Sequence, residues 1–152
     1  MKATFAEYEV SILAYCLMPN HYHFLLRQES ERPVSNWIRR LFNGYVQAVN
    51  KQQGRSGTLF ESRAKHVLVA DDAYAMHLTR YIHLNPVRAG LTSKAADWVF
   101  SNYREWIGER AGCLFNQGFM TSYFKTPSEY REFVECHAAD LEQKYIQHYL
   151  HP

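Results

Sequence analysis

Residues 15–26 read YCLMPNHYHFLL, and this stretch predicts a β-hairpin. Apolar residues precede the Pro19-Asn20 pair, which is typical of a turn, and His21–Arg27 has the pattern of a returning strand. Side chains alternate between the two faces of a strand, so His21 and His23 are expected on the same face. The hairpin therefore predicts two imidazoles side by side.

The His21 and His23 pair is open to two interpretations from these residues alone. Both rings can be half-buried and hydrogen-bonded within the sheet, because short His-x-His matches are common. Alternatively, two imidazoles on one strand face can share the coordination sphere of a divalent metal. The second interpretation requires a further ligand from elsewhere in the chain.

A candidate for that ligand lies in residues 80–91, which read RYIHLNPVRAGL. A helix is expected over 71–85, with Pro86 ending it. Tyr81 and Asn85 are four residues apart, which places them on one helical face. If this face packs over the histidines, Asn85 supplies an amide oxygen and Tyr81 points at the same centre. Otherwise Tyr81 is a core aromatic residue and Asn85 caps the helix.

The other patterns predict a single α+β domain over residues 1–152. The expected elements are a His-x-His strand pair at 9–28, a basic helix at 34–53, a strand at 58–69, the tyrosine helix at 71–85 and a C-terminal helical region at 97–150, with a helix at 127–149. Trp37, Phe42 and Tyr45 lie on the apolar stripe of the basic helix and are expected in the core.

Positive charge is concentrated in one part of the chain. The formal net charge is only +2, yet residues 32–65 hold seven Lys and Arg against the single acidic residue Glu61. This excess either indicates a polyanionic partner or is a solvated helix face that happens to be basic. The three cysteines form no close pair in the sequence, which favours a reducing compartment, and a cytoplasmic location is expected. No stretch has the length of a membrane span, so no membrane partner is expected.

Five segments together carry a family resemblance. They are AYCLMPNHYHFLL (14–26), NKQQGRSGTLFESRAKHVLV (50–69), RYIHLNPVRAGL (80–91), DWVFSNYREWIG (97–108) and PSEYREFVE (127–135). In this order they resemble the HUH single-strand tyrosine transposases, and most closely the bacterial branch of REP-associated, IS200-like tyrosine transposases. The resemblance covers the chain from about Ala14 to Glu135.

The resemblance implies a fold and a set of functional residues. The fold is a ferredoxin-like antiparallel sheet with helices packed on one face. His21 and His23 match the paired histidines that bind a divalent cation, expected to be Mg²⁺ or Mn²⁺, and Asn85 matches the position of the third ligand. Tyr81 matches the nucleophile that forms a 5′-phosphotyrosine link while it cleaves and rejoins single-stranded DNA.

The partner implied by the resemblance is single-stranded DNA that carries a hairpin, and a homodimer is compatible with it. The basic side chains most suited to DNA contact are Arg39, Arg40, Arg55, Arg63 and Lys65. Arg88, in the Asn-Pro-x-Arg segment, either contacts DNA or braces its turn.

Two departures from the family pattern keep other functions open. About eight residues precede the first predicted strand, so the family's N-terminal strand and helix are expected to be absent, leaving strand edges exposed. Ala64 replaces an aromatic residue between Arg63 and Lys65. A module that binds DNA hairpins without strand transfer is therefore an alternative, and a metal phosphodiesterase that uses water as its nucleophile is a more distant one.

Overall fold

A computed structural model describes residues 7–136 of the chain. The chain divides into two compact units, which are described separately. The first unit comprises residues 1–10 and 28–68, and the second comprises residues 11–27 and 69–152. Within residues 7–136, no helix combines the length and apolar character needed to cross a membrane.

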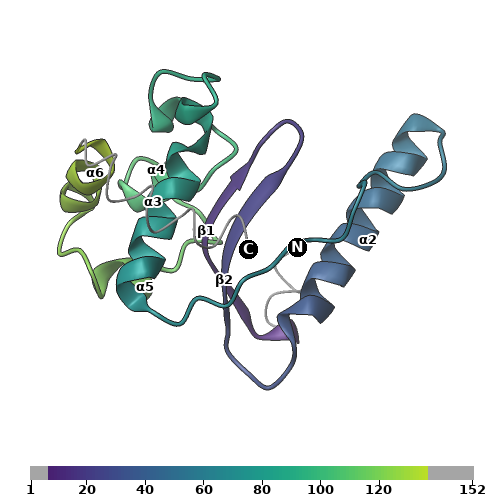
Figure 1. Ribbon diagram of the computed structural model, residues 1–152, viewed down its shortest axis with the longest axis horizontal. Coiled ribbons are helices and arrows are strands. Elements are labelled where there is room, and N and C mark those ends of the chain that lie inside the picture. Colours follow the sequence, from purple (N-terminus) through teal and green to yellow (C-terminus); the bar gives the residue numbers. More distant parts are fainter. Residues whose placement is uncertain (1–6, 137–152) are drawn as a thin grey trace. The chain divides into compact units, whose positions relative to one another are not determined.

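The predicted hairpin is confirmed as a two-stranded sheet of β1 (Val10–Leu17) and β2 (Tyr22–Gln28) (Figure 1). The Met18 amide donates to the His21 carbonyl over 2.9 Å and closes the Pro-Asn turn. His21 immediately precedes β2, and His23 lies within it. Most of β1 is buried, which agrees with its near-continuous apolar sequence.

The edge of β1 that faces away from β2 is covered by the segment Trp98–Asn102. The Leu17 amide donates to the Phe100 carbonyl over 2.9 Å, and the Asn102 amide donates to the Tyr15 carbonyl over 3.3 Å. An antiparallel bridge joins Cys16 to the same segment. This edge is therefore hydrogen-bonded, although the covering segment is too irregular to count as a strand.

Helix α3 (Asp72–Arg88) carries the tyrosine motif and begins where the sequence predicts, with the Asp71 side chain accepting a hydrogen bond from the Tyr74 amide over 3.0 Å. The predicted end at 85 is wrong, because Pro86 lies inside the helix and the last helical residue is Arg88. Proline removes one backbone donor but does not end this helix.

The second unit is completed by short helices after α3. They are η1 (Ala95–Asp97), α4 (Tyr103–Trp106), α5 (Gln117–Thr121) and α6 (Pro127–Glu135). The predicted helix at 127–149 is confirmed over Pro127–Glu135 and is wrong at Cys136, which has an extended backbone. The remainder of the prediction, 137–149, lies outside the described residues. The Arg80 guanidinium donates to the Val134 carbonyl over 3.2 Å and to the Cys136 carbonyl, and so binds the carbonyl end of α6.

The first unit is built on α2 (Val34–Gln53), whose bounds equal the predicted 34–53. Gly54 follows with a φ of 60°, the left-handed conformation in which helices commonly end. The predicted strand at 58–69 is wrong, because these residues have no regular structure and no strand of the described chain pairs with them. Trp37 is buried as expected, but Tyr45 is 55% exposed, so its predicted core position is wrong.

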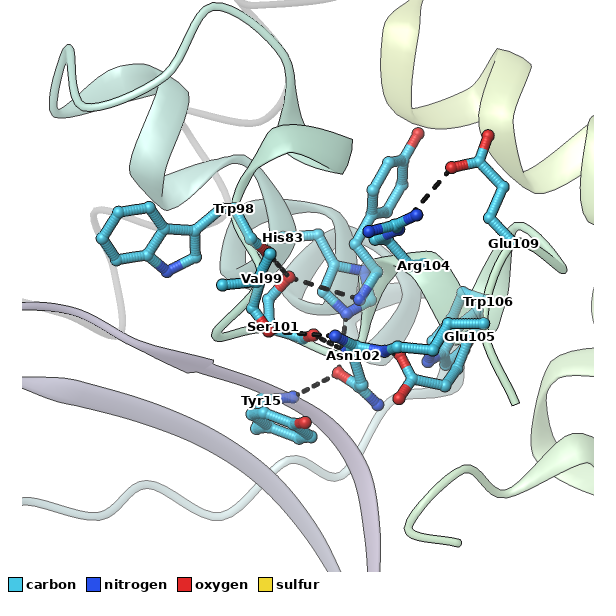
Figure 2. Close-up of polar contacts among 12 residues, drawn as sticks. Tyr15, His83, Trp98, Val99, Ser101, Asn102, Arg104, Glu105, Trp106 and Glu109 are labelled. Carbon is cyan, nitrogen blue, oxygen red and sulfur yellow. Dashed lines mark hydrogen bonds and ion pairs between the residues drawn. The ribbon is translucent and has the colours of Figure 1, made fainter. Parts of the chain in front are cut away.

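A buried polar network holds α3 against β1 in the second unit, and Figure 2 shows Asn102 at its centre. The Asn102 side-chain oxygen accepts from the Tyr15 amide over 2.7 Å and from His83 Nε2 over 2.9 Å. Its Nδ2 donates to the Leu13 carbonyl over 3.1 Å. The Tyr130 hydroxyl lies 2.6 Å from the other ring nitrogen of His83 and donates to it.

We expect Asn102→Ala to destabilise the protein by about 3 kcal/mol. The substitution leaves the buried Tyr15 amide and His83 Nε2 without their acceptor, and each orphaned donor costs about 1–3 kcal/mol. Urea unfolding followed by circular dichroism measures the loss, with Asn43→Ala on the exposed surface of α2 as the control. Equal stability of the two variants would contradict the role given to Asn102.

We also expect stability to fall as the pH drops from about 7 to 4. Burial lowers the pKa of His83 from 6.5 to about 4, so the unfolded chain binds a proton in this window that the folded chain does not. The contribution of His83 to stability is fully present above pH 6.5, its pKa in the unfolded chain, and is lost as the pH falls toward about 4, its pKa in the folded chain. The free energy of unfolding should fall by up to about 3 kcal/mol. Urea unfolding at several pH values should show a smaller dependence in His83→Gln than in the exposed control His66→Gln. Identical pH dependences would contradict this assignment.

Candidate active site

The two histidine rings of the hairpin lie next to each other, as the sequence predicts. The ring centroids of His21 and His23 are 4.9 Å apart and the rings are nearly perpendicular, at 86°. Nδ1 of His21 is 2.7 Å from Asn20 Oδ1. An amide oxygen only accepts hydrogen bonds, so Nδ1 carries the proton and Nε2 of His21 keeps its lone pair.

His23 is partly buried and neutral at neutral pH. Burial and the neighbouring His21 lower the pKa of His23 to about 4, and the Asn85 side chain opposes this shift. Nε2 of His23 is buried and has no partner within hydrogen-bonding geometry in the described part of the chain. A buried nitrogen without a hydrogen bond is costly, and coordination of a cation is one way to satisfy it.

Helix α3 brings the Asn85 side chain next to His23. This side chain is buried and interacts with His23, and its Nδ2 donates to the Tyr81 carbonyl one helical turn earlier over 3.1 Å. Because Nδ2 is engaged within the helix, the amide oxygen is the atom available to a cation. Among residues 7–136, no group of three or more His, Cys, Asp or Glu residues could hold a metal ion. A set of three ligands at this place would have to include the Asn85 amide oxygen.

Tyr81 lies against this set of residues. Its ring centroid is 5.7 Å from that of His23, with the rings at 79° to each other. The guanidinium carbon of Arg88 lies over the same ring, 5.1 Å from its centroid. The structure therefore brings together His21, His23, Tyr81 and Asn85. Tyr81 is partly buried and packs against the hydrophobic core, as the core-aromatic alternative expects, and its ring also contacts His23.

The other basic residues chosen from the sequence lie in the first unit. Arg39 and Arg40 are exposed and line a groove on the N-terminal half of α2. The remaining lining residues are Glu7, Tyr8, Arg32, Asn36 and Asn43. Arg55, Arg63 and Lys65 are exposed in the segment after α2, where Arg55 donates to the Thr58 carbonyl over 3.2 Å.

Two further residues belong to these sites: Asn20 was not among the expected site residues, and Arg32 was counted only in the positive charge of residues 32–65. Asn20 fixes the tautomer of His21, and its position directly before the histidine pair was a usable signal. Arg32 joins Arg39 and Arg40 in the groove, although it lies before the helix begins. Because Arg32 precedes the helix, the periodicity of α2 does not predict that its side chain lines the groove.

Comparison with known proteins places this chain in a family. Residues 1–85 match the family model of IS200-like transposases. A Haemophilus influenzae protein assigned to the REP-associated tyrosine transposases is 25% identical over 112 residues, which cover 67% of this chain and 64% of that protein. The chain thus spans slightly less than two thirds of the length of this relative.

A solved structure has the same fold. It is a REP-associated tyrosine transposase bound to a REP hairpin, with a TM-score of 0.58 and 20% identity, covering 76% of this chain and 71% of the other. The likeness supports the predicted α+β class. In this chain the sheet has two strands within the described residues. Since the family model covers more than half of the sequence, including the histidine pair, Tyr81 and Asn85, this chain belongs to the IS200-like transposase family.

Proposed function

We propose that this protein cleaves and rejoins single-stranded DNA beside hairpins, through a covalent bond between Tyr81 and a 5′ phosphate. The observation that carries the proposal is the meeting of Tyr81 with His23 and Asn85, two residues whose ligand atoms are suited to a cation. The membership of the family and the relatives assigned to REP-associated tyrosine transposases support it.

His21, His23 and Asn85 would hold a divalent cation, Mg²⁺ or Mn²⁺. The set consists of two neutral imidazoles and one amide oxygen, so the ion would keep its full positive charge. Oxygen atoms of phosphate and water would complete its coordination. When bound, the ion would polarise a non-bridging oxygen of the scissile phosphate.

The reaction would exchange one phosphodiester bond for another. The Tyr81 hydroxyl oxygen forms a bond to phosphorus while the bond from phosphorus to the 3′ oxygen of the preceding nucleotide breaks. The phenol loses a proton, and the departing 3′ oxygen gains one, so no net proton is consumed. Attack by another 3′ hydroxyl on the phosphotyrosine reverses the step and rejoins the DNA without an external energy source.

The first unit would bind the phosphate backbone of the DNA. Arg39 and Arg40, together with Arg32, place three cationic side chains along one groove, which suits neighbouring phosphates. Arg55, Arg63 and Lys65 would extend the contact beyond the end of α2. The solved relative was determined with a REP hairpin bound, and we propose a hairpin partner for this chain as well.

A homodimer and a cytoplasmic location belong to the same proposal. A homodimer would bring two DNA ends together.

Covalent trapping tests the function. The protein is incubated with Mn²⁺ and a single-stranded hairpin oligonucleotide labelled at its 5′ or its 3′ end, and the products are separated on a denaturing gel. We expect a protein–DNA band that carries only the 3′ label, because the 5′ fragment leaves with a free 3′ hydroxyl. Cleavage without a covalent band would indicate a phosphodiesterase that uses water. Binding of the hairpin without cleavage would indicate an inactive DNA-binding module.

A further inference from the structure

The groove on α2 contains more than its arginines. One stripe along the N-terminal half of the helix lines it and consists of Asn36, Arg39, Arg40 and Asn43. Their spacing of i, i+3, i+4 and i+7 puts them on the same helical face. The Arg39 guanidinium donates to Asn36 Oδ1 over 3.2 Å, which fixes the orientation of that amide. Arg40 and Asn43 are exposed, so the stripe presents cations and amides together.

The groove also receives an aromatic ring from the residues that precede β1. Tyr8 is partly buried and lines the groove together with Glu7. Arg32 Nη1 donates to the Glu7 carbonyl over 2.6 Å, and the Glu29 amide donates to the Glu9 carbonyl over 2.8 Å. Glu9 has a φ of 49°, a left-handed conformation that is uncommon for a residue other than glycine and persists only where surrounding contacts hold it. These contacts hold the Tyr8 ring beside the residues that lead into α2.

This set of side chains is larger than a phosphate-binding groove requires. Phosphate oxygens only accept hydrogen bonds, so the N–H groups of arginines satisfy them. The Glu7 carboxylate and the Asn43 amide oxygen are acceptors, and neither these nor an aromatic ring contribute to phosphate binding. A nucleobase has a π-face that stacks on an aromatic ring and an edge that carries both donors and acceptors. The groove therefore suits a whole nucleotide better than a phosphate alone.

We propose that this groove binds one unpaired nucleotide of the DNA and selects its base. The inference rests on the proposed function and adds the residues that determine sequence preference. Arg40 contacts the phosphate, Tyr8 stacks on the base and Asn43 hydrogen-bonds to the base edge. The amide of asparagine matches adenine, which has an exocyclic amino donor next to a ring-nitrogen acceptor. Neighbouring base pairs cover the faces of a base in a duplex, so only an unpaired base can stack on Tyr8.

The test measures the affinity for two hairpins by fluorescence anisotropy, in the Tyr81→Phe background and without metal. Both hairpins have an unpaired flank at each end, made of deoxyadenosines in one DNA and of abasic sites in the other. The two DNAs carry the same phosphates, so the ratio of their dissociation constants isolates the contribution of the bases. The variants are Tyr8→Ala, Tyr8→Phe, Asn43→Ala and Arg40→Met. Tyr45→Ala is the control, because Tyr45 is an exposed tyrosine of α2 that does not line this groove.

We expect the deoxyadenosine-flanked hairpin to bind about 10-fold more tightly than the abasic one, the size of the effect of one base stacked on an aromatic side chain. Tyr8→Ala should bring this ratio close to one, and Asn43→Ala should lower it, without a change in affinity for the abasic hairpin. Tyr8→Phe and Tyr45→Ala should keep the ratio. Arg40→Met should weaken both DNAs by the same factor and reduce the salt dependence of binding.

Equal binding of the two hairpins by the parent protein, or an unchanged ratio in Tyr8→Ala, would overturn the inference and leave a groove that binds only phosphates. If circular dichroism shows that Tyr8→Ala is unfolded, Asn43→Ala decides, and an unchanged ratio in that variant overturns the inference. A parent protein that binds neither hairpin would instead overturn the DNA partner of the proposed function.

Discussion

Tyr81→Phe is expected to abolish the covalent protein–DNA adduct while leaving hairpin binding within about twofold of wild type. Phenylalanine keeps the ring that contacts His23 and Arg88 but lacks the hydroxyl oxygen that would bond to phosphorus. A covalent step cannot proceed without its nucleophile, so the band on the denaturing gel should fall below detection. Fluorescence anisotropy with a labelled hairpin measures the retained affinity.

Tyr45→Phe is the matched control for this substitution. Tyr45 is 55% exposed on α2, so loss of its hydroxyl tests whether any exposed tyrosine contributes to the adduct. The control should form adduct at the wild-type rate. An adduct of undiminished yield in Tyr81→Phe would show that another residue is the nucleophile, and the assignment of Tyr81 would be wrong.

His23→Ala is expected to have an effect of comparable size through the cation. The substitution removes the ring that contacts His21, Asn85 and Tyr81, and with it one of the three proposed ligands. We expect the affinity for Mn²⁺, measured by titration calorimetry without DNA, to fall at least about 100-fold, because loss of even an outer-shell partner costs about 10–100-fold. Adduct formation should fall by a similar factor at a fixed low Mn²⁺ concentration.

The exposed His66 lies in the other unit and provides the control, as His66→Gln. It should bind Mn²⁺ like wild type, and His21→Ala should behave like His23→Ala. Unchanged Mn²⁺ binding in both His21→Ala and His23→Ala would show that these imidazoles do not form the metal site, whatever their effect on activity.

The local parts of the fold could be predicted from the sequence. The hairpin follows from a turn pair between two apolar runs, and α2 has its predicted bounds because a continuous apolar stripe ends at a glycine that adopts a positive φ. Each half of the site could also be predicted from the periodicity of one element, since His23 lies in β2 beside His21, which immediately precedes the strand, and Tyr81 and Asn85 are one helical turn apart. The meeting of the two halves could not be predicted from periodicity and was expected only from the family resemblance.

The failures concern residues whose structure depends on a distant partner. The apolar residues at 58–69 have strand character, but a strand needs a neighbour to bond with, and none of the described residues supplies one. The apolar pattern after Pro127 continues beyond Cys136, but the buried Arg80, far away in the sequence, binds the carbonyls at the end of α6. Pro86 predicts the end of a helix, yet this residue is buried within the tertiary structure and lies inside α3.

The most direct measurement is the identity of the residue that carries the DNA. The adduct formed by wild-type protein with a 3′-labelled hairpin is trimmed with nuclease, digested with protease and sequenced by tandem mass spectrometry. The account predicts a nucleotide 5′-phosphate on the peptide that contains Tyr81, and no modified peptide in Tyr81→Phe. A nucleotide attached to any other residue, or through a 3′ phosphate, would contradict it.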